Sequence, residues 1–272
     1  MTTAKICFIG SGNMTRSIVS GLVSSGYSTE LIETTNPSLP KLEAMKADFG
    51  VKVSQDNEQA VKNSDVVVLG VKPQLMQSVC EALSHLDLSK KLIITIAAGI
   101  PCQRYHDYFK QQINLIRTMP NTPTQIGVGV TGIYAPAEIT DTQKQCCESI
   151  MKTGGEVVWV DEESELNQVI ALAGSSPAYF FLFMEAMIEA GEKMSLPKEQ
   201  VGLMVQQAAL GAAEMVKQNP NLSAAQLRQN VTSKGGTTAK AIETFEQGGI
   251  RSLVDNAMTN CINRAEEMEK LF

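Results

Sequence analysis

The amino-acid sequence predicts an α/β fold in which a mostly parallel sheet, covered by helices on both faces, is followed by an all-helical domain. In the first 162 residues, short apolar runs alternate with amphipathic stretches of helical period, the pattern of strand–helix–strand units. From Glu163 to Phe272 the apolar residues repeat only at helical spacing. We therefore expect two domains, residues 1–162 and residues 163–272.

The strands of the first domain are expected at short apolar runs, and its helices at the amphipathic stretches between them. The expected strands are residues 6–9, 31–35, 66–71, 92–97, 113–117 and 157–159. The expected helices are residues 13–25, 40–48, 74–84 and 140–151. Connections between parallel strands are right-handed, so few topologies are compatible with this order.

The second domain is expected to be built from helices at 164–191, 197–217, 223–229, 237–247 and 250–269. Residues 177–191, PAYFFLFMEAMIEAG, are apolar nearly all round, and residues 201–216 are rich in Ala and Gly. A helix that is apolar on every side must be buried on every side. A domain of about 110 residues offers little interior for this. We therefore expect an obligate homodimer with helices that interlock between chains; a tightly packed bundle core is the alternative.

Composition argues against several classes of partner and cofactor. The 272 residues are 43% apolar and carry a net charge of −6 with no long basic run, which argues against nucleic-acid binding. No continuous apolar run reaches the about 18 residues of a membrane span, and the N-terminus lacks the layout of a signal peptide, so we expect a cytoplasmic protein with no membrane partner. The six cysteines show no C-x-x-C spacing and there are two histidines, so no metal site is expected.

The segment KICFIGSGNMTRSIVSGLVSSG, residues 5–26, indicates a dinucleotide-binding loop of the Rossmann type. An apolar run ends in Gly10-Ser11-Gly12, and a helical period follows at once. In G-x-G-x-x-G the first glycine permits the tight turn, the second lets the backbone approach the pyrophosphate, and the third lets helix and strand pack closely. Thr15 replaces the third, so we expect somewhat wider packing there. The phosphates are expected on the helix N-terminus, at Gly10, Ser11, Gly12, Asn13 and Met14; a plain tight turn is the alternative.

The end of the second strand, LIETTNPS, favours NADPH over NADH. Glu33 lies three residues short of the turn, so no carboxylate stands at the turn to repel a 2′-phosphate. Asn36 and Ser38 can donate hydrogen bonds there, and Lys41 adds a positive charge nearby. We therefore predict that NADPH is preferred and that NADH is possible. A turn that merely suits the sequence Asn-Pro-Ser is the alternative.

Five further stretches carry a resemblance to a known family. They are Val71-Lys72-Pro73, Ala97-Ala98-Gly99, MPNTP at 119–123, GSSPAY at 174–179 and NVTSKGGTTAKAIETFE at 230–246. Together and in this order they resemble the Δ1-pyrroline-5-carboxylate reductase family, across essentially the whole chain. The resemblance implies a Rossmann-type domain and a helical dimerisation domain, with dimers that several members assemble into larger rings. It also implies NADPH- or NADH-dependent reduction of the ring C=N of 1-pyrroline-5-carboxylate to L-proline, the last step of proline biosynthesis.

The resemblance places the substrate at the glycine turn before the helix at 237–247. The amides of Thr237 and Thr238 are expected to bind the substrate carboxylate, and the Thr238 hydroxyl to meet the ring nitrogen as the catalytic hydrogen-bond partner. Asn230, Ser233 and Gly236 are expected to complete this pocket. Lys234 stands where the family usually has proline, and either loosens the loop or adds a cation near the carboxylate. A Gly-Gly turn with a threonine N-cap is the structural alternative.

The loops at the carboxyl ends of parallel strands form the ligand crevice of such a sheet, so further cofactor contacts are expected there. Asn57 is expected on the adenosine side and Asn121 on the nicotinamide side. Lys72 is alternatively a solvated lysine, and Ser175 to Pro177 open the long helix, where they either pack or contact substrate. The expected cofactor-binding residues are thus Gly10, Ser11, Gly12, Asn13, Met14, Asn36, Ser38, Asn57, Val71, Lys72, Pro73, Ala97, Ala98, Gly99 and Asn121.

Two other functions remain open at this point. One is a reductase of a related cyclic imino acid, such as a six-membered ring. The other is a nucleotide-binding regulator that has kept the fold without turnover; the presence of Asn230, Ser233, Gly236 and Thr238 argues against it.

Overall fold

The computed structural model describes residues 4–271 of the chain, which form two compact units. The first unit contains the chain up to Pro177 and again from Cys261, and the second is Ala178–Asn260. The helices Ser176–Glu192 and Ile250–Leu271 each have residues in both units. The units are defined by compactness, whereas the boundary expected after residue 162 separates the two functional domains. We keep that boundary as a proposal for the functional domains.

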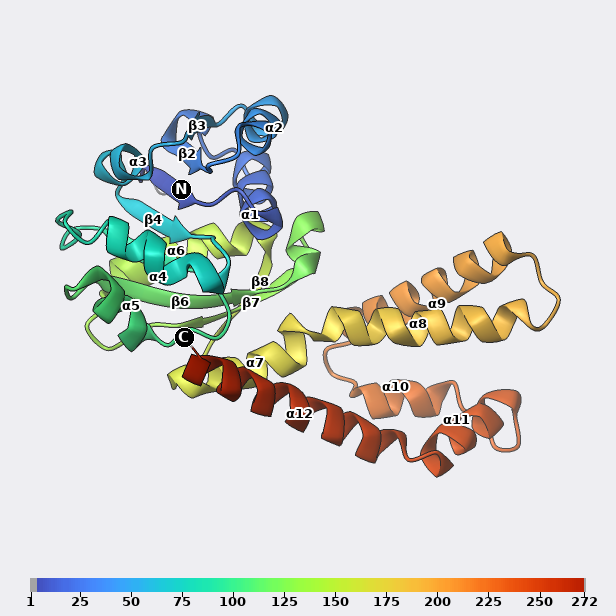
Figure 1. Ribbon diagram of the computed structural model, residues 1–272. Coiled ribbons are helices and arrows are strands. Elements are labelled where there is room, and N and C mark those ends of the chain that lie inside the picture. The colour runs from blue at the N-terminus through green and yellow to red at the C-terminus, as the bar shows by residue number, and fades with distance from the viewer. Residues whose placement is uncertain (1–3, 272) are drawn as a thin grey trace. The chain divides into compact units, whose positions relative to one another are not determined.

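The first unit is built on an eight-stranded sheet with the order β3-β2-β1-β4-β5-β6-β7-β8 (Figure 1). Neighbouring strands are parallel except β6 and β7, which are antiparallel. The sheet is therefore mostly parallel, as predicted. The strands are β1 Ile6–Ile9, β2 Ile32–Thr35, β3 Lys52–Ser54, β4 Val66–Leu69, β5 Leu92–Thr95, β6 Asn114–Pro120, β7 Gly129–Tyr134 and β8 Gly155–Trp159.

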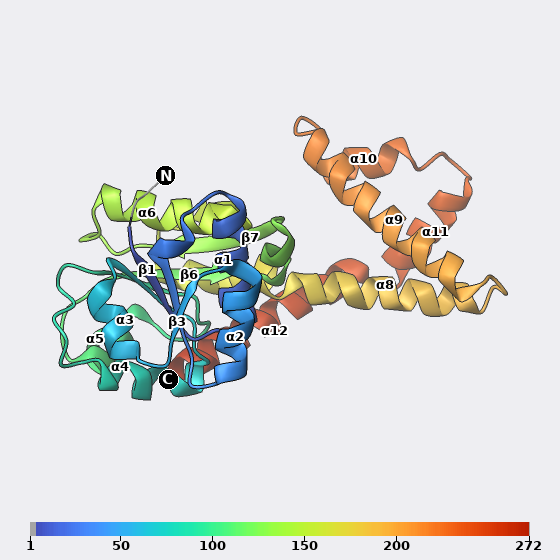
Figure 2. The ribbon, with the colours of Figure 1, turned by 90° about the horizontal axis from the view of Figure 1, so that it is seen from above.

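Helices cover both faces of this sheet and create two separate apolar cores. One core joins the sheet to α3, α4 and α5, and the other joins it to α1, α2 and α6. Figure 2 shows α4 and α5 on one side of the sheet and α6 on the other. The helices are α1 Asn13–Ser24, α2 Leu39–Phe49, α3 Asn57–Asn63, α4 Pro73–Ala82, α5 Cys102–Phe109 and α6 Asp141–Met151.

Two strands and two α-helices of the first unit were not predicted, and each is short or poorly marked. β3 has three residues and begins with an exposed lysine, and β7 contains Gly129 and Gly132, which weaken a strand pattern. The helices α3 and α5 have seven and eight residues, too few for a clear helical period. The six predicted strands and four predicted helices are all present.

The helical part of the chain holds no strand in its described residues. The helix predicted over 164–191 is divided: a 3-10 turn at Glu163–Glu165 leads into α7 and then into a π-helical turn at Ile170–Gly174. The helices are α7 Leu166–Val169, α8 Ser176–Glu192, α9 Lys198–Gln218, α10 Ala224–Asn230, α11 Thr237–Gln247 and α12 Ile250–Leu271.

The surface of α8 is unusually apolar. Phe180 and Leu182 are 64% and 66% exposed, and α8 has no buried residue. The run Glu163–Glu192 is long and apolar enough to cross a membrane by length and composition alone. A helix whose apolar surface is buried against another subunit would have the same length and composition.

Candidate active site

The glycine loop lies at the carboxyl edge of the sheet, at the point where the strand order changes direction. β1 pairs with β2 on one side and with β4 on the other. The Gly10 amide donates to the Thr35 carbonyl at 2.9 Å, and the Gly70 amide donates to the Ile9 carbonyl at 2.9 Å. The loops that follow β1, β2 and β4 therefore meet at one place. In open α/β sheets this switch point is where ligands bind.

Gly10 and Gly12 have different reasons to lack a side chain. Gly10 has a φ of +103°, and a Cβ there would lie 2.7 Å from the Gly70 carbonyl oxygen, so the fold itself requires glycine. A Cβ on Gly12 would approach a single described atom, the Gly70 carbonyl oxygen, at 3.9 Å. The space beside Gly12 is thus open on the protein side, which fits a position that a ligand approaches closely.

The N-terminus of α1 presents backbone amides with no side-chain cap. Gly12 is the N-cap, and the first intrahelical bond is from the Arg16 amide to the Gly12 carbonyl at 2.9 Å. By contrast, α3, α6 and α10 begin with Asp56, Thr140 and Ser223, whose side chains accept from the first turn. The first-turn amides of α1 are therefore available to an anion, as a dinucleotide diphosphate requires.

Thr15 is accommodated by a glycine on the neighbouring strand. Thr15 is fully buried, and a Cβ on Gly70 would overlap its hydroxyl oxygen. That hydroxyl has no hydrogen-bond partner among the described residues. The Thr15 side chain thus occupies space that a side chain at residue 70, directly after β4, would otherwise fill. Gly70 is therefore a residue of the candidate site that the sequence alone did not indicate.

The turn after β2 is a compact polar loop next to the glycine loop. The Asn36 side-chain oxygen accepts from the Ser38 amide at 2.9 Å, and the Ser11 hydroxyl donates to the Thr35 carbonyl at 3.2 Å. Gln55 closes the loop from β3 by donating to the Pro37 carbonyl at 2.7 Å. Asn36 itself is half-buried, and Lys41 is exposed on the first turn of α2.

The remaining expected cofactor residues follow successive strands along the same edge. Val71, Lys72 and Pro73 form the start of α4, and Ala97, Ala98 and Gly99 follow β5. Asn57 is the first residue of α3, after β3, and Asn121 follows β6. Asn57 and Asn121 therefore flank the switch point on opposite sides.

The Asn121 side chain forms structural hydrogen bonds that the sequence did not indicate. Its amide nitrogen donates to the Ala173 carbonyl in the π-helical turn at 3.0 Å, and its oxygen accepts from the Val130 amide at 2.9 Å. Both polar atoms of this nearly buried side chain thus hold backbone groups. Asn121 fixes the π-helical turn to the end of β6, and a contact to a ligand would use its backbone.

The expected substrate residues lie together in the second unit, in the loop between α10 and α11. Asn230 ends α10, and Thr237 begins α11 behind Gly235, whose φ is +74°. The Gly236 amide donates to the Ser233 carbonyl at 3.0 Å, which closes the turn. Gly236 is the N-cap of α11 and provides no side-chain cap, and Thr237 and Thr238 are exposed. This helix N-terminus, like that of α1, offers free amides to an anion.

A buried arginine on β6, also missed from the sequence, joins two distant parts of the chain. Arg117 on β6 donates to Glu163 at 2.9 Å and to Glu269 at 3.0 Å. Those two carboxylates hold its charge, as a buried charge requires. An arginine inside the apolar run 113–117 is a sequence signal for such a site, but the partners cannot be read from the run, because Glu269 lies 152 positions away.

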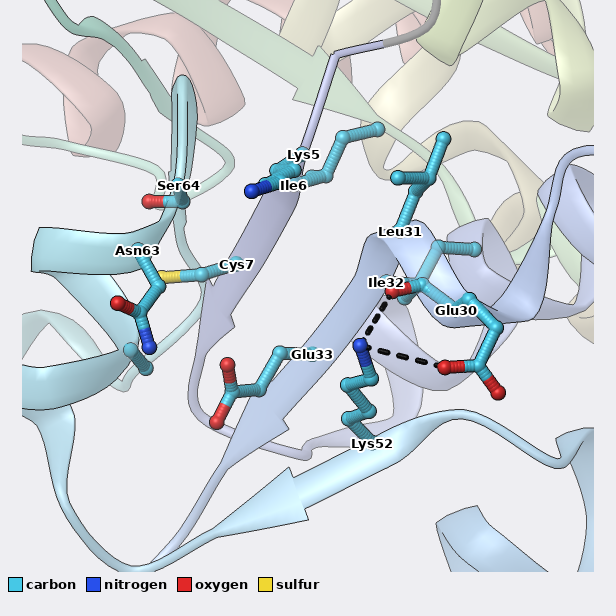
Figure 3. A pocket seen from close by; sticks show the side chains of 11 residues that line it. Lys5, Ile6, Cys7, Glu30, Leu31, Ile32, Glu33, Lys52, Asn63 and Ser64 are labelled. Atoms are coloured by element: carbon cyan, nitrogen blue, oxygen red, sulfur yellow. Dashed lines mark hydrogen bonds and ion pairs between the residues drawn. The ribbon is translucent and has the colours of Figure 1, made fainter.

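A cavity of about 190 Å³ lies elsewhere on the sheet, toward the amino ends of β1, β2 and β3. Figure 3 shows Glu33 and Lys52 in it, and the Cys7 side chain next to Asn63. Lys52 donates to the Glu30 carbonyl at 2.8 Å, while burial raises the pKa of Glu33, partly offset by the Lys52 charge. Because ligands of such sheets bind at the carboxyl ends, we do not assign this cavity to the reaction. Glu33 faces it, which agrees with the absence of a carboxylate at the ribose position.

The buried thiols of Cys7 and Cys80 give no nucleophile to this site. Burial raises the pKa of Cys7 and of Cys80 to about 12, so both remain protonated at neutral pH. Among the described residues no group of three or more His, Cys, Asp or Glu side chains could hold a metal ion. What the described residues offer is anion binding by backbone amides, together with hydrogen bonding.

Comparison with known families divides the chain in two. A family model described as pyrroline-5-carboxylate reductase dimerisation matches residues 163–268. A second, described as NADP oxidoreductase coenzyme F420-dependent, matches residues 5–99. The second match covers the glycine loop and the loops after β2, β4 and β5.

Curated relatives match over the full length. Pyrroline-5-carboxylate reductase of Vibrio alginolyticus is 51% identical over 272 residues, covering all of both chains. The enzyme of the same name from Pseudomonas aeruginosa is 39% identical, covering 98% of each chain.

Solved structures are similar over the same length. A pyrroline-5-carboxylate reductase from Coxiella burnetii matches with a TM-score of 0.92 and 44% identity, covering 98% of this chain and 99% of that one. The Plasmodium falciparum pyrroline carboxylate reductase with NADP bound matches with a TM-score of 0.88 and 27% identity, covering 99% of each.

Proposed function

The chain belongs to the pyrroline-5-carboxylate reductase family, and we propose that it reduces the C=N bond of 1-pyrroline-5-carboxylate to L-proline. It is accordingly an NAD(P)-dependent oxidoreductase acting on a C=N group. The observation that carries the proposal is that one chain holds two uncapped, glycine-led helix N-termini, at α1 and α11. The first suits a diphosphate and the second a carboxylate, and this reaction needs both.

The first unit fits a nicotinamide dinucleotide at its carboxyl edge. The amides of α1 hold the diphosphate, and the open space at Gly12 allows its close approach. The loops Val71–Pro73 and Ala97–Gly99 line the crevice toward the nicotinamide end, and Asn57 lies toward the adenosine. When bound, the dinucleotide supplies the hydride.

The chain's own contribution is to bind and orient the imine. The Thr237 and Thr238 amides donate hydrogen bonds to the substrate carboxylate at the N-terminus of α11, with Asn230, Ser233 and Gly236 around it. The Thr238 hydroxyl donates a hydrogen bond to the ring nitrogen, on which electron density increases during reduction. Orientation and hydrogen bonding of this kind supply most of the acceleration in such reactions.

NADPH is the proposed preferred cofactor. Asn36 and Ser38 present donors beside the ribose position, Lys41 adds positive charge, and Glu33 is turned into the cavity of Figure 3. Asn36→Asp places a carboxylate next to the 2′-phosphate, so we expect it to lower kcat/KM for NADPH at least 10-fold and to leave kcat/KM for NADH within about threefold. Lys46→Gln on α2, which also changes the net charge by −1 but lies away from the turn, serves as a charge control. A wild-type preference for NADH would contradict this proposal.

The helical domain is proposed to form a homodimer, with a larger ring of dimers as a further possibility for the assembly. Its match to a dimerisation family and its exposed apolar surface support this. We assign the apolar run Glu163–Glu192 to subunit contact rather than to a membrane, and we propose a cytoplasmic location.

Spectrophotometry of NADPH oxidation tests the activity directly. The purified chain is supplied with 1-pyrroline-5-carboxylate and, in parallel, with a six-membered cyclic imino acid. We expect a higher kcat/KM for the five-membered ring and L-proline as the product. Faster turnover of the six-membered ring would support the alternative imine reductase. NADPH binding without any turnover would indicate a regulator.

A further inference from the structure

The end of α12 is attached to the centre of the sheet by a buried ionic group. The Arg117 side chain is 3% exposed and forms ion pairs with Glu163 at 2.9 Å and Glu269 at 3.0 Å. Asn167, also buried, donates to the second carboxylate oxygen of Glu269 at 3.4 Å. The last turns of α12 are thus fixed to β6 and to α7 by charged and polar contacts around a buried guanidinium, where an ion pair is stronger than on an open surface.

The residue before Glu269 packs directly on the loop after β5. A Cβ on Gly99 would lie 3.0 Å from the Met268 Cβ and 3.2 Å from the Met268 Cε. Gly99 also has a φ of +75°, so its conformation and its contact with α12 both require glycine. The Met268 side chain therefore packs against one side of the loop Ala97–Gly99.

The opposite side of this loop is held by hydroxyl groups. The Ala97 amide donates to the Thr95 hydroxyl at 3.3 Å, and that hydroxyl shares a hydrogen bond of 2.5 Å with Tyr105 of α5. The Cys102 amide, at the start of α5, donates at 2.7 Å to the same Glu163 oxygen that accepts from Arg117. Tyr105 and the Cys102 amide both belong to α5, so this helix connects the two sets of contacts.

We propose that the last turn of α12 positions the cofactor loop, with Met268 as the residue that contacts the loop and the Arg117–Glu269 pair as its anchor. The loop Ala97–Gly99 follows β5, next to β4 at the switch point, where a shift of its backbone changes the nicotinamide end of the crevice. The inference rests on the proposed function, because it assigns that loop to the cofactor. Met268 and Glu269 are positioning residues that act through Gly99 and do not touch the substrate.

The first test compares Met268→Ala with Met268→Leu. Alanine removes the side chain beyond Cβ and leaves every ion pair in place, so the variant should fold. We expect its Kd for NADPH, from fluorescence titration without substrate, to rise about 3- to 10-fold, and its KM for NADPH to rise in parallel. The KM for the imine should stay within twofold. Met268→Leu refills the space and should restore the Kd. Hydrogen exchange at residues 97–100 should speed up in the alanine variant alone.

The second test compares Glu269→Gln with Glu267→Ala. Glutamine weakens the Arg117 contact but keeps a hydrogen-bond acceptor, and should raise the Kd for NADPH in the same range. Glu267 lies two residues earlier, and pairs with Arg264 on the exposed side of α12 at 2.7 Å, so Glu267→Ala should leave the Kd unchanged.

The results separate the inference from the proposed function. If both Met268→Ala and Glu269→Gln bind NADPH as the wild type does, the inference is wrong, even where their melting temperatures fall. If the wild type binds NADPH but reduces no imine, the proposed function fails, while the Kd comparison still decides the inference. A wild type that binds neither NADPH nor NADH overturns both.

Discussion

Thr238 is the side chain on which the proposed reduction depends most directly. It is exposed on the first turn of α11, next to amides that remain in place when its side chain is removed. Thr238→Ala deletes one hydrogen-bond donor to the ring nitrogen and leaves the carboxylate site intact. Loss of one well-placed donor costs about 10²-fold in rate, so we expect kcat/KM for the imine to fall by about that factor. Steady-state kinetics at saturating NADPH measures it.

The control for this prediction lies on the same helix. The Thr244 hydroxyl donates to the Lys240 carbonyl at 3.1 Å, two turns beyond the glycine turn, so Thr244→Ala should leave kcat/KM unchanged. NADPH affinity should be unaffected in both variants, because α11 belongs to the second unit. A Thr238→Ala enzyme with near-normal kcat/KM, or with a defect mainly in NADPH binding, would count against the assigned role.

The partly buried carboxyl group of Glu33 should make the stability of the fold depend on pH. Burial raises its pKa above the ordinary 4.5, so the folded chain holds this proton more tightly than the unfolded chain. The protonated form is therefore favoured in the fold, and stability falls as pH rises through 4.5 and then through the raised pKa. Glu33→Gln removes this penalty, so its melting temperature should exceed that of the wild type at pH 7 and converge with it at pH 4. Glu43→Gln, on the exposed side of α2, should show no such pH-dependent difference.

At the scale of elements, α1 packs against the end of β4 because the Thr15 side chain fills the space that the missing side chain of Gly70 leaves free. Gly70→Ala places a methyl group against the Thr15 hydroxyl, and we expect it to lower the free energy of unfolding by about 2 kcal/mol, as overpacking does. Thr15→Ala in the same chain removes the overlap and should recover most of the loss. Chemical denaturation of the two single variants and the double variant measures the coupling. Additive effects would show that the two positions do not share this space.

The sequence predicted those elements whose pattern is complete within the element itself. Ile6–Ile9 and Val66–Leu69 are fully buried runs, and each reads as a strand without help from its neighbours. β7 was not predicted, because Gly129 and Gly132 interrupt its apolar pattern. Both positions are glycine because packing leaves no room for a side chain: a Cβ at Gly132 would lie 2.7 Å from a Val169 methyl group. Its residues satisfy tertiary packing at the expense of strand propensity, and a local pattern cannot reveal that.

The candidate site shows the same limit. The two glycine turns before α1 and α11 were evident as structure, because glycines directly before a helical period mark such a turn in the sequence. Their role in binding an anion stays a prediction. The turn chemistry of Asn36 was also readable locally. The supports of these loops were not: Thr15 needs Gly70, and Arg117 needs Glu163 and Glu269, partners that only the fold brings together.

At the scale of the whole molecule, the two compact units differ in how they bury apolar residues. In the first unit, two cores cover both faces of the sheet. In the second, large apolar side chains of α8, α9 and α12 remain exposed, among them Phe181, Leu203 and Leu253. An exposed apolar surface of this extent is typical of an interaction site, and the dimerisation family matches these same helices.

We therefore expect a stable dimer at micromolar concentration, with a mass near 59 kDa, twice the 29.4 kDa of the chain, by size exclusion with light scattering. Leu182, 66% exposed on α8, is a sensitive position: Leu182→Glu places a charge in the contact and should yield monomers or an unstable chain. Leu75→Glu makes the same change on exposed α4 in the first unit, where it should leave the mass unchanged. A ring of dimers would appear as a larger multiple of the same mass, and Leu182→Glu should abolish it too, because each ring is built from the dimer. A wild-type chain that stays monomeric would contradict the prediction, since the exposed apolar helices would then lack the partner that their surface requires.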